Sequence, residues 1–291
     1  MKTICVASAT GGTGKSLVAA VLGKILPETI LADLSFSQGG LRTYAGGEPF
    51  RIMEHSKTLM ANRFERNCVQ QGACLQACPV GAIHLTYIDP CLCNGCGQCI
   101  ASCSQEALYL TPNPAGRWYY ADTAAGLMLD TDLVGANDFD ADFALQVYGE
   151  AQALASARQA SYLIVDTAAG FGETEKSIMQ DADLVLLVSQ PSQKEMIALE
   201  HEAAFIDSLG SNIALCINKA TLSSDFTMAL IDWGIGKKIK TAGKIDYDEE
   251  LLKRLYASME EKQSFFGLMS NELKAQFAKL MVTIQFIMKE G

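Results

Sequence analysis

The stretch SATGGTGKS, residues 8–16, lies between an apolar segment of strand length, 3–7, and a helix-forming segment, 17–22. Glycines at a strand-to-helix turn let backbone N–H groups converge on phosphate oxygens, and the helix that follows directs the positive end of its dipole at the same anion. The stretch is therefore predicted to be a P-loop, in which Lys15 reaches the β and γ phosphates and Ser16 binds Mg²⁺. The predicted nucleotide-binding residues of the loop are Gly11, Gly12, Thr13, Gly14, Lys15 and Ser16.

Composition and charge limit the classes of protein and partner. The chain has 291 residues, of which 49% are hydrophobic and 19% are charged, as expected for a globular protein with a sizeable core. The net charge is -10 and no basic tract occurs, which argues against a nucleic-acid partner. No apolar run approaches the length of a membrane span, and the first strand enters the P-loop directly. We therefore expect a cytoplasmic protein without a membrane partner.

Cysteine is concentrated in one part of the chain. Eight of the ten cysteines lie between Cys68 and Cys103, and in a reducing compartment this density favours metal or redox chemistry over disulfides. Residues 68–85 match residues 93–110 at a constant shift of 25, the separation of Cys68 and Cys93. The second copy has the C-x2-C-x2-C-x3-C spacing of bacterial two-cluster ferredoxins. A zinc ribbon is the alternative, but zinc sites usually separate two C-x2-C pairs and take four ligands.

The two copies predict two iron–sulfur sites. Each site combines three cysteines of one copy with the last cysteine of the other, which reaches across after a short helical turn. The complete [4Fe-4S] site consists of Cys78, Cys93, Cys96 and Cys99. The second site retains Cys68, Cys74 and Cys103, because Gln71 stands where the other copy has a cysteine. Three states of the second site are left open, namely a [3Fe-4S] cluster, a [4Fe-4S] cluster with one exposed iron, and an empty site. Cys91 is an alternative ligand for the second site, but its place two residues before Cys93 puts it nearer the complete site. Cys91 is therefore interpreted, with Cys5 and Cys216, as a small apolar residue.

Several motifs resemble those of the MinD/ParA group of deviant-Walker P-loop ATPases. The P-loop has the tandem glycines of the family motif K-G-G-x-G-K-[ST], with Thr10 at the position of the first lysine. Two apolar strands end at carboxylates, one at Asp33, as in the family's D-x-D motif, and one at Asp166, as in its D-x-P-A-G motif. A later apolar strand ends at Asn218, where the family has an asparagine.

The resemblance implies a role for each of these residues. Lys15, Asp33 and Asp166 are the implied catalytic residues. Asp166 would orient Mg²⁺ together with Ser16, the Gly170 amide would sense the γ-phosphate, and Asn218 would hydrogen-bond the adenine edge. Ser35 replaces the second carboxylate of D-x-D, and Ala168 replaces the proline of D-x-P-A-G. Because a serine without a partner cannot act as a general base near neutral pH, ATP hydrolysis is expected to be slow or organised differently.

The order of motifs predicts the architecture. Strands that alternate with helices indicate a doubly wound, mostly parallel α/β sheet covered on both faces. We expect a P-loop ATPase domain in two parts, 1–61 and 113–291, interrupted by a small α+β ferredoxin-like domain at 62–112. The acidic stretch from Arg117 to Ala144 is expected to be irregular.

The two kinds of motif together suggest a function. We expect an ATP-binding iron–sulfur protein that couples nucleotide state to electron transfer with a redox partner. The alternatives are an iron–sulfur cluster scaffold or carrier, and a nucleotide-sensing partner protein with little hydrolysis. Slow ATP hydrolysis and a homodimer are left open. The expected cofactors are ATP, Mg²⁺, one [4Fe-4S] cluster and, where the second site is filled, a second cluster.

Overall fold

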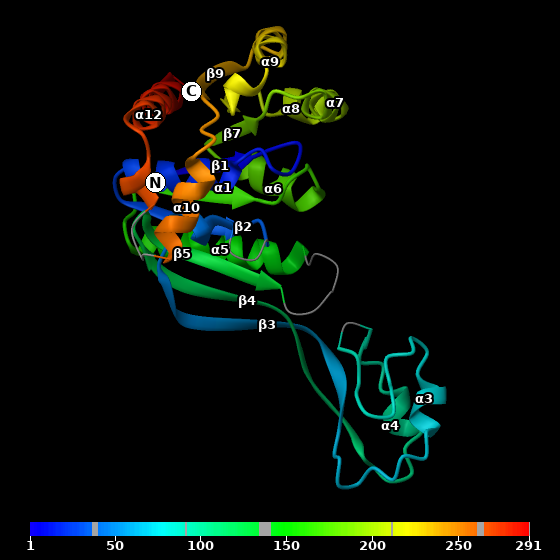
Figure 1. Ribbon diagram of the computed structural model, residues 1–291. Coiled ribbons are helices and arrows are strands. Elements are labelled where there is room, and N and C mark those ends of the chain that lie inside the picture. The colour runs from blue at the N-terminus through cyan, green and yellow to red at the C-terminus, as the bar shows by residue number, and fades with distance from the viewer. Residues whose placement is uncertain (37–39, 91, 134–140, 211, 261–264, 291) are drawn as a thin grey trace. The chain divides into compact units, whose positions relative to one another are not determined.

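The computed structural model describes residues 1–36, 40–90, 92–133, 141–210, 212–260 and 265–290 (Figure 1). The chain divides into two compact units. The first, called here the sheet unit, comprises residues 1–51, 119–131 and 144–291. The second, called the cysteine unit, comprises residues 52–118 and 132–143.

The described strands form one sheet. They are β1 Lys2–Ala7, β2 Thr29–Leu34, β3 Glu48–Arg63, β4 Leu108–Thr123, β5 Gly126–Leu133, β6 Tyr162–Thr167, β7 Leu184–Ser189, β8 Ile213–Asn218 and β9 Lys240–Ile245. Their order in the sheet is β3-β4-β5-β2-β6-β1-β7-β8-β9. Every neighbouring pair from β5 to β9 is parallel. The predicted α/β fold with a mostly parallel sheet is thus confirmed.

Helices cover both faces of this sheet. The described helices are α1 Lys15–Ile25, α2 Gly40–Ala45, α3 Ala73–Ala77, α4 Gln98–Ala101, α5 Ala141–Ala157, α6 Glu173–Asp181, α7 Gln193–His201, α8 Ala203–Ser208, the 3-10 helix Ala220–Leu222, α9 Ser224–Gly236, α10 Leu251–Glu260, α11 Phe265–Leu268 and α12 Asn271–Glu290. Alternate strand residues such as Ile4 and Val6 pack in one core with α1, α2, α10, α11 and α12. The intervening residues, such as Cys5 and Val165, are just as buried. Figure 1 shows α7, α8 and α9 on the side of the sheet opposite α10 and α12.

The last helix packs on the sheet. Leu273, Phe277, Leu280 and Ile284 of α12 are buried, at the i, i+3, i+4 spacing of one helix face. A Cβ atom on Gly243 of β9 would lie 3.2 Å from Leu280, so the absence of a side chain there lets the helix approach the strand closely. None of the described helices combines the length and the apolar character that crossing a membrane requires.

The expectation of an irregular stretch from Arg117 to Ala144 was wrong. β4 and β5 occupy most of it and are joined by a tight turn. In this turn the Thr123 hydroxyl donates to the Gly126 carbonyl at 2.6 Å and accepts the Ala125 N–H at 3.1 Å. Asp130 of β5 is tolerated in the buried strand because Arg42, from a distant part of the chain, pairs with it, as described below.

The two sequence copies in the cysteine unit have similar backbone conformations at matched positions. Residues with positive φ recur in pairs at the 25-residue shift seen in the sequence, namely Gln70 and Gly95, Gly72 and Gly97, and Gly81 and Glu106. The short helices α3 and α4 follow the second pair. Each copy also directs a backbone amide at its last cysteine sulfur. The Ala82 N–H donates to Cys78 Sγ at 3.2 Å, and the Ala107 N–H donates to Cys103 Sγ at 3.4 Å.

Candidate functional site

The P-loop joins β1 to α1 in the sheet unit. Gly12 and Gly14 have φ angles of 82° and 92°, in the left-handed region that glycine tolerates best. At Gly14 there is also no room for a side chain, because a Cβ atom would lie 2.2 Å from Nδ2 of Asn218. α1 begins at Lys15 without a side-chain cap or an acidic residue in its first turn. Its N-terminal amides and its dipole are therefore available to an anion.

Side-chain hydrogen bonds, two of them from Asn218 and Lys219 outside the loop, hold its backbone in place. Three loop carbonyls accept side-chain hydrogen bonds: Thr10 O from Ser8 Oγ at 2.7 Å, Gly12 O from Lys219 Nζ at 2.6 Å, and Thr13 O from Asn218 Nδ2 at 2.7 Å. The Gly170 N–H donates to the Ser8 carbonyl at 2.9 Å. Two residues predicted for nucleotide contact, Asn218 and Gly170, therefore bond to the loop itself. Their predicted contacts with adenine and the γ-phosphate stay predictions.

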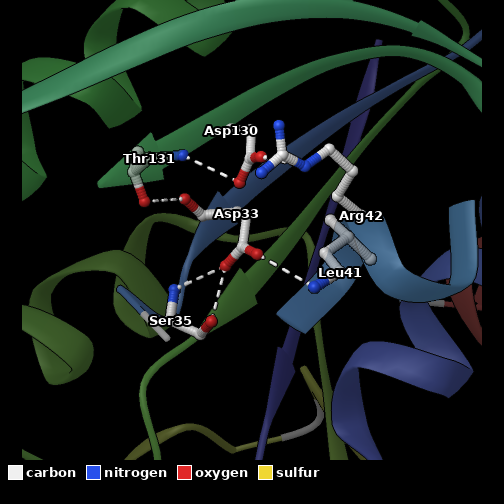
Figure 2. A network of polar contacts seen from close by, with 6 residues as sticks. All are labelled: Asp33, Ser35, Leu41, Arg42, Asp130 and Thr131. Atoms are coloured by element: carbon white, nitrogen blue, oxygen red, sulfur yellow. Dashed lines mark hydrogen bonds and ion pairs between the residues drawn. The ribbon is translucent and has the colours of Figure 1, made fainter. Parts of the chain in front are cut away.

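Asp33 ends β2 as a heavily hydrogen-bonded carboxylate (Figure 2). Its Oδ1 accepts the Ser35 N–H at 2.9 Å and the Ser35 hydroxyl at 2.6 Å, and its Oδ2 accepts the Leu41 N–H at 3.0 Å. Burial raises the pKa of Asp33, although these hydrogen bonds act in the opposite direction. Ser35 therefore has a hydrogen-bond partner. That partner is the Asp33 carboxylate, whose two oxygens each accept one backbone amide as well.

Asp166 ends β6 directly beside Asp33, since the two residues are register partners in neighbouring strands. Its side chain is fully buried, and neither carboxylate oxygen has a hydrogen-bond partner among the described residues. Burial, followed by the nearby Asp33 charge, raises the pKa of Asp166 to about 7, while Lys15 and the Ser16 hydroxyl act to lower it. Unlike Asp33, this carboxylate accepts no hydrogen bond from a backbone amide in the described chain.

A polar network beside Asp33 was not predicted from the sequence (Figure 2). Nε of Arg42, on α2, lies 3.0 Å from Oδ2 of Asp130, on β5, and the Asp130 side chain is only 2% exposed. The Thr131 N–H donates to Asp130 at 3.0 Å, and the Thr131 hydroxyl donates to the Asp33 carbonyl at 2.7 Å. The network therefore ties the end of β5 to the end of β2.

Glu195 is a second residue that the sequence did not reveal. It lies on α7, is fully buried, and its Oε2 accepts the Thr10 hydroxyl, while its Oε1 has no partner among the described residues. Burial raises the pKa of Glu195, and the bond from Thr10 acts against this. The sequence S-x-x-E at Ser192 is typical of a helix capping box, and the Glu195 N–H does donate to the Ser192 hydroxyl at 3.3 Å. The carboxylate, however, bonds to Thr10, where the resembled family has lysine.

These elements surround a cleft of about 650 Å³. Its lining comes from the P-loop, from the carboxyl ends of parallel strands, where α/β proteins bind ligands, and from α2, α10 and α12. The lining includes Gly11, Gly12, Gly14, Lys15, Ser16, Ser35, Ala169, Asn218, Lys219 and residues 245–248. A cleft of this volume lies in the range of small-molecule sites. Asp33 and Asp166 are buried behind the lining.

The predicted cysteine ligands fall into two cavities of the cysteine unit. One cavity is lined by Cys78, Cys93, Cys96 and Cys99, and the other by Cys68, Cys74 and Cys103 together with Gln71. Although burial acts to raise it, four backbone amides lower the pKa of the Cys78 thiol. Burial raises the pKa of Cys99. Cys91 lies outside the described residues.

The second cavity differs from the first at two positions that touch each other. Gln71 replaces the cysteine that corresponds to Cys96, and Ser104 replaces the proline that corresponds to Pro79. The Ser104 hydroxyl donates to Oε1 of Gln71 at 3.2 Å. In neither cavity, nor elsewhere in the described chain, do three or more His, Cys, Asp or Glu side chains converge as ligands of one metal ion.

Comparison with solved structures identifies the fold. A ParA family ATPase from Chlorobium tepidum TLS is 15% identical with a TM-score of 0.53, covering 97% of this chain and 98% of that chain. The septum site-determining protein MinD with Mg-ADP from Pyrococcus horikoshii OT3 is 14% identical with a TM-score of 0.53, covering 96% and 94%. A variant of Cyanothece McdA in complex with ATP is 16% identical with a TM-score of 0.54, covering 98% and 96%. No family model and no curated protein matches the sequence. The sheet unit has the fold of MinD/ParA P-loop ATPases.

These findings contradict the expected coupling of nucleotide state to electron transfer. The similar structures are ATPases of the MinD/ParA kind, and the described residues hold no group arranged around a metal ion. The prediction of electron transfer was wrong because a redox activity was inferred from the cysteine spacing alone. A spacing motif constrains which atoms can bind a cofactor, whereas electron transfer also requires a partner and a potential that no residue pattern specifies.

Proposed function

We propose that the cleft of the sheet unit binds Mg-ATP and that the chain works as an ATPase of the MinD/ParA kind. The observation that carries the proposal is Asp166, a fully buried carboxylate near the end of β6 that accepts no backbone amide in the described chain. Burial raises its pKa, and nearby Lys15 and Ser16 act to lower it. A buried anion of this kind is unfavourable unless a cation compensates it. The residues fit Mg²⁺, a hard cation that takes one or two carboxylate or hydroxyl oxygens and keeps several waters.

Each P-loop residue has a defined task in this proposal. The loop amides and the α1 N-terminus hold the phosphate oxygens, Lys15 neutralises the terminal phosphates, and Ser16 and Asp166 hold the metal. Mg²⁺ held by Ser16 and Asp166 would supply positive charge that offsets the negative charge developing on the transferred phosphate. The nucleotides named for two of the similar structures, ATP for the McdA variant and Mg-ADP for MinD, support this assignment.

Hydrolysis is expected to be either slow or organised differently. Ser35 stands where the resembled family has its second carboxylate, and its hydroxyl donates to Asp33. A homodimer, a cytoplasmic location and the absence of nucleic-acid and membrane partners stay part of the proposal.

The test is equilibrium binding of ATP and ADP in the presence of Mg²⁺ to the wild-type chain and to Lys15→Met. Wild type should bind one nucleotide per chain, and the variant at least tenfold more weakly, because it loses a charge-assisted contact. Lys244→Met is the matched control, since Lys244 lies on β9 outside the cleft lining and carries the same charge. Equal affinities of wild type and Lys15→Met would contradict the proposal.

We propose separately that residues 62–112 form a ferredoxin-like insert whose cysteines hold iron–sulfur clusters as bound cofactors, without assigning them a redox role. Support comes from the four cysteines that line one cavity, the three that line the other, and the amide hydrogen bonds to Cys78, Cys93 and Cys103. Amides directed at sulfur favour the thiolate, which is the form that binds metal. A cluster spans more space than a single ion, so its cysteine ligands need not converge on one point, and the cluster proposal is compatible with the lack of a single-ion site in the described residues. The residues therefore fit thiolate-bound iron.

Anaerobic iron and sulfide analysis with electron paramagnetic resonance tests the cluster proposal. Reconstituted wild type should contain stoichiometric iron and sulfide, and Cys96→Ser should lose iron from the site with four cysteines. Cys216→Ser serves as the control, because Cys216 is a buried core residue of β8 in the sheet unit. Wild type with zinc in place of iron and no acid-labile sulfide would contradict the proposal.

A further inference from the structure

Lys219 is a partly buried cation whose contacts are all with neutral groups. It follows β8, lines the cleft, and directs its Nζ at the Gly12 carbonyl (2.6 Å) and at Oε1 of Gln190 (3.2 Å). No carboxylate forms an ion pair with it in the described part of the chain. Burial lowers its pKa. Desolvation of this ammonium costs free energy, and its hydrogen bond to the Gly12 carbonyl offsets part of that cost.

The backbone of Lys219 is adapted to this contact. Its φ angle is 56°, in the left-handed region that costs a residue with a side chain free energy. The neighbouring Asn218 supports the turn, because its Oδ1 accepts the Lys219 N–H at 3.0 Å. Asn218 then uses its Nδ2 to bind the Thr13 carbonyl. Two consecutive residues at the end of β8 thus bind two consecutive carbonyls of the P-loop.

Binding a carbonyl also sets the direction of the next amide. A peptide group is planar and trans, so its C=O and its N–H point in opposite directions. When Lys219 holds the Gly12 carbonyl, the Thr13 N–H of the same peptide points away from Lys219. A glycine peptide can otherwise rotate readily, and Gly12 has open space where a side chain would be. The rotated peptide would turn its carbonyl, a negative dipole, toward the phosphates.

We infer that Lys219 is a positioning residue, which holds the peptide between Gly12 and Thr13 so that the Thr13 N–H faces the nucleotide phosphates. The inference rests on the proposed function of the cleft. It assigns Lys219 no contact with the nucleotide. It predicts that the residue matters for ligands that carry phosphate and not for the nucleoside part.

The test compares Lys219→Met, Lys219→Arg and the charge control Lys244→Met in binding ATP, pyrophosphate and adenosine. Lys219→Met should bind ATP and pyrophosphate about tenfold more weakly, the loss expected for one hydrogen bond to a charged group. Its affinity for adenosine and its melting temperature without ligand should be unchanged. Lys219→Arg should restore most of the affinity, because a guanidinium can also donate to the carbonyl. Lys244→Met should bind all three ligands like wild type.

The salt dependence separates positioning from simple attraction of charges. A positioning effect should keep the tenfold difference between wild type and Lys219→Met at high ionic strength, whereas attraction at a distance is screened. The inference is overturned if Lys219→Met binds ATP like wild type, if it weakens adenosine and ATP equally, or if the difference disappears in high salt. Wild type that binds neither ATP nor pyrophosphate would instead reject the proposed function and the inference together.

Discussion

Asp166→Asn should make the ligand-free protein more stable while removing the metal site. The wild-type carboxylate is fully buried and has no hydrogen-bond donors among the described residues. The rise of its pKa from 3.8 to about 7 corresponds to roughly 4 kcal/mol of lost stability at and above neutral pH. The neutral amide avoids this loss at nearly the same volume. Some of the gain is offset because the amide is itself a polar group without partners, so about 2 kcal/mol is expected.

The direction of the pKa shift determines how the stability difference between the variant and wild type changes with pH. A carboxyl whose pKa is higher in the folded than in the unfolded chain destabilises the protein above the folded value, and the effect disappears as the pH falls below the unfolded value. The advantage of Asp166→Asn over wild type should therefore be largest at pH 8 and should shrink steadily toward pH 4. Chemical denaturation without nucleotide or Mg²⁺, repeated across this range, measures the difference.

Asp33→Asn is the matched control, because Asp33 is the register partner of Asp166 and differs mainly in its three hydrogen bonds. An amide cannot accept at both of its atoms, so this variant should gain less stability than Asp166→Asn or lose some. A destabilised Asp166→Asn protein at pH 8, or an advantage that does not change with pH, would show that the buried Asp166 carboxylate does not destabilise the ligand-free protein. In the same samples, Mg²⁺-dependent binding of ATP should be lost in Asp166→Asn.

Three further predictions concern the loop, the polar network and the cysteine cavities. Gly14→Ala should weaken ATP binding at least tenfold in a titration, because a Cβ atom there would meet the side-chain amide at the end of β8 at 2.2 Å. Gly12→Ala, with a similar φ but open space, should lose less. Arg42→Ala should lower the unfolding free energy by about 2 kcal/mol, because it leaves buried Asp130 without its ion pair; Arg42→Ala with Asp130→Asn should recover part of the loss. Gln71→Cys should raise the iron content of reconstituted protein, and unchanged iron would count against a second cluster site.

Local motifs made the P-loop predictable. A strand, a glycine-rich turn and a helix follow one another within the first 25 residues, so no distant contact is needed to recognise them. The strand-end positions of Asp33 and Asp166 were predictable for the same reason. Their placement side by side was not, because it depends on β2 and β6 being neighbours in the sheet.

Distant contacts account for what the sequence did not reveal. Asp130 is buried in β5 because Arg42 pairs with it, and no motif in the sequence links these two residues. Glu195 has the position of an ordinary capping residue, and only the folded chain brings it to Thr10. The acidic character of residues 117–144 indicated a solvated loop for the same reason. A charged residue is predicted to be exposed unless an ion-pair or hydrogen-bond partner can be identified for it.

Binding of Mg-ATP in the cleft at the P-loop underlies every role proposed for the sheet unit. Isothermal titration calorimetry of the purified chain with ATP, in the presence and absence of Mg²⁺, tests it most directly. We expect one site per chain whose affinity falls when Mg²⁺ is removed, because the metal then no longer compensates the negative charges of Asp166 and the phosphates. Binding that is absent, or that is equally strong without Mg²⁺, would contradict this expectation.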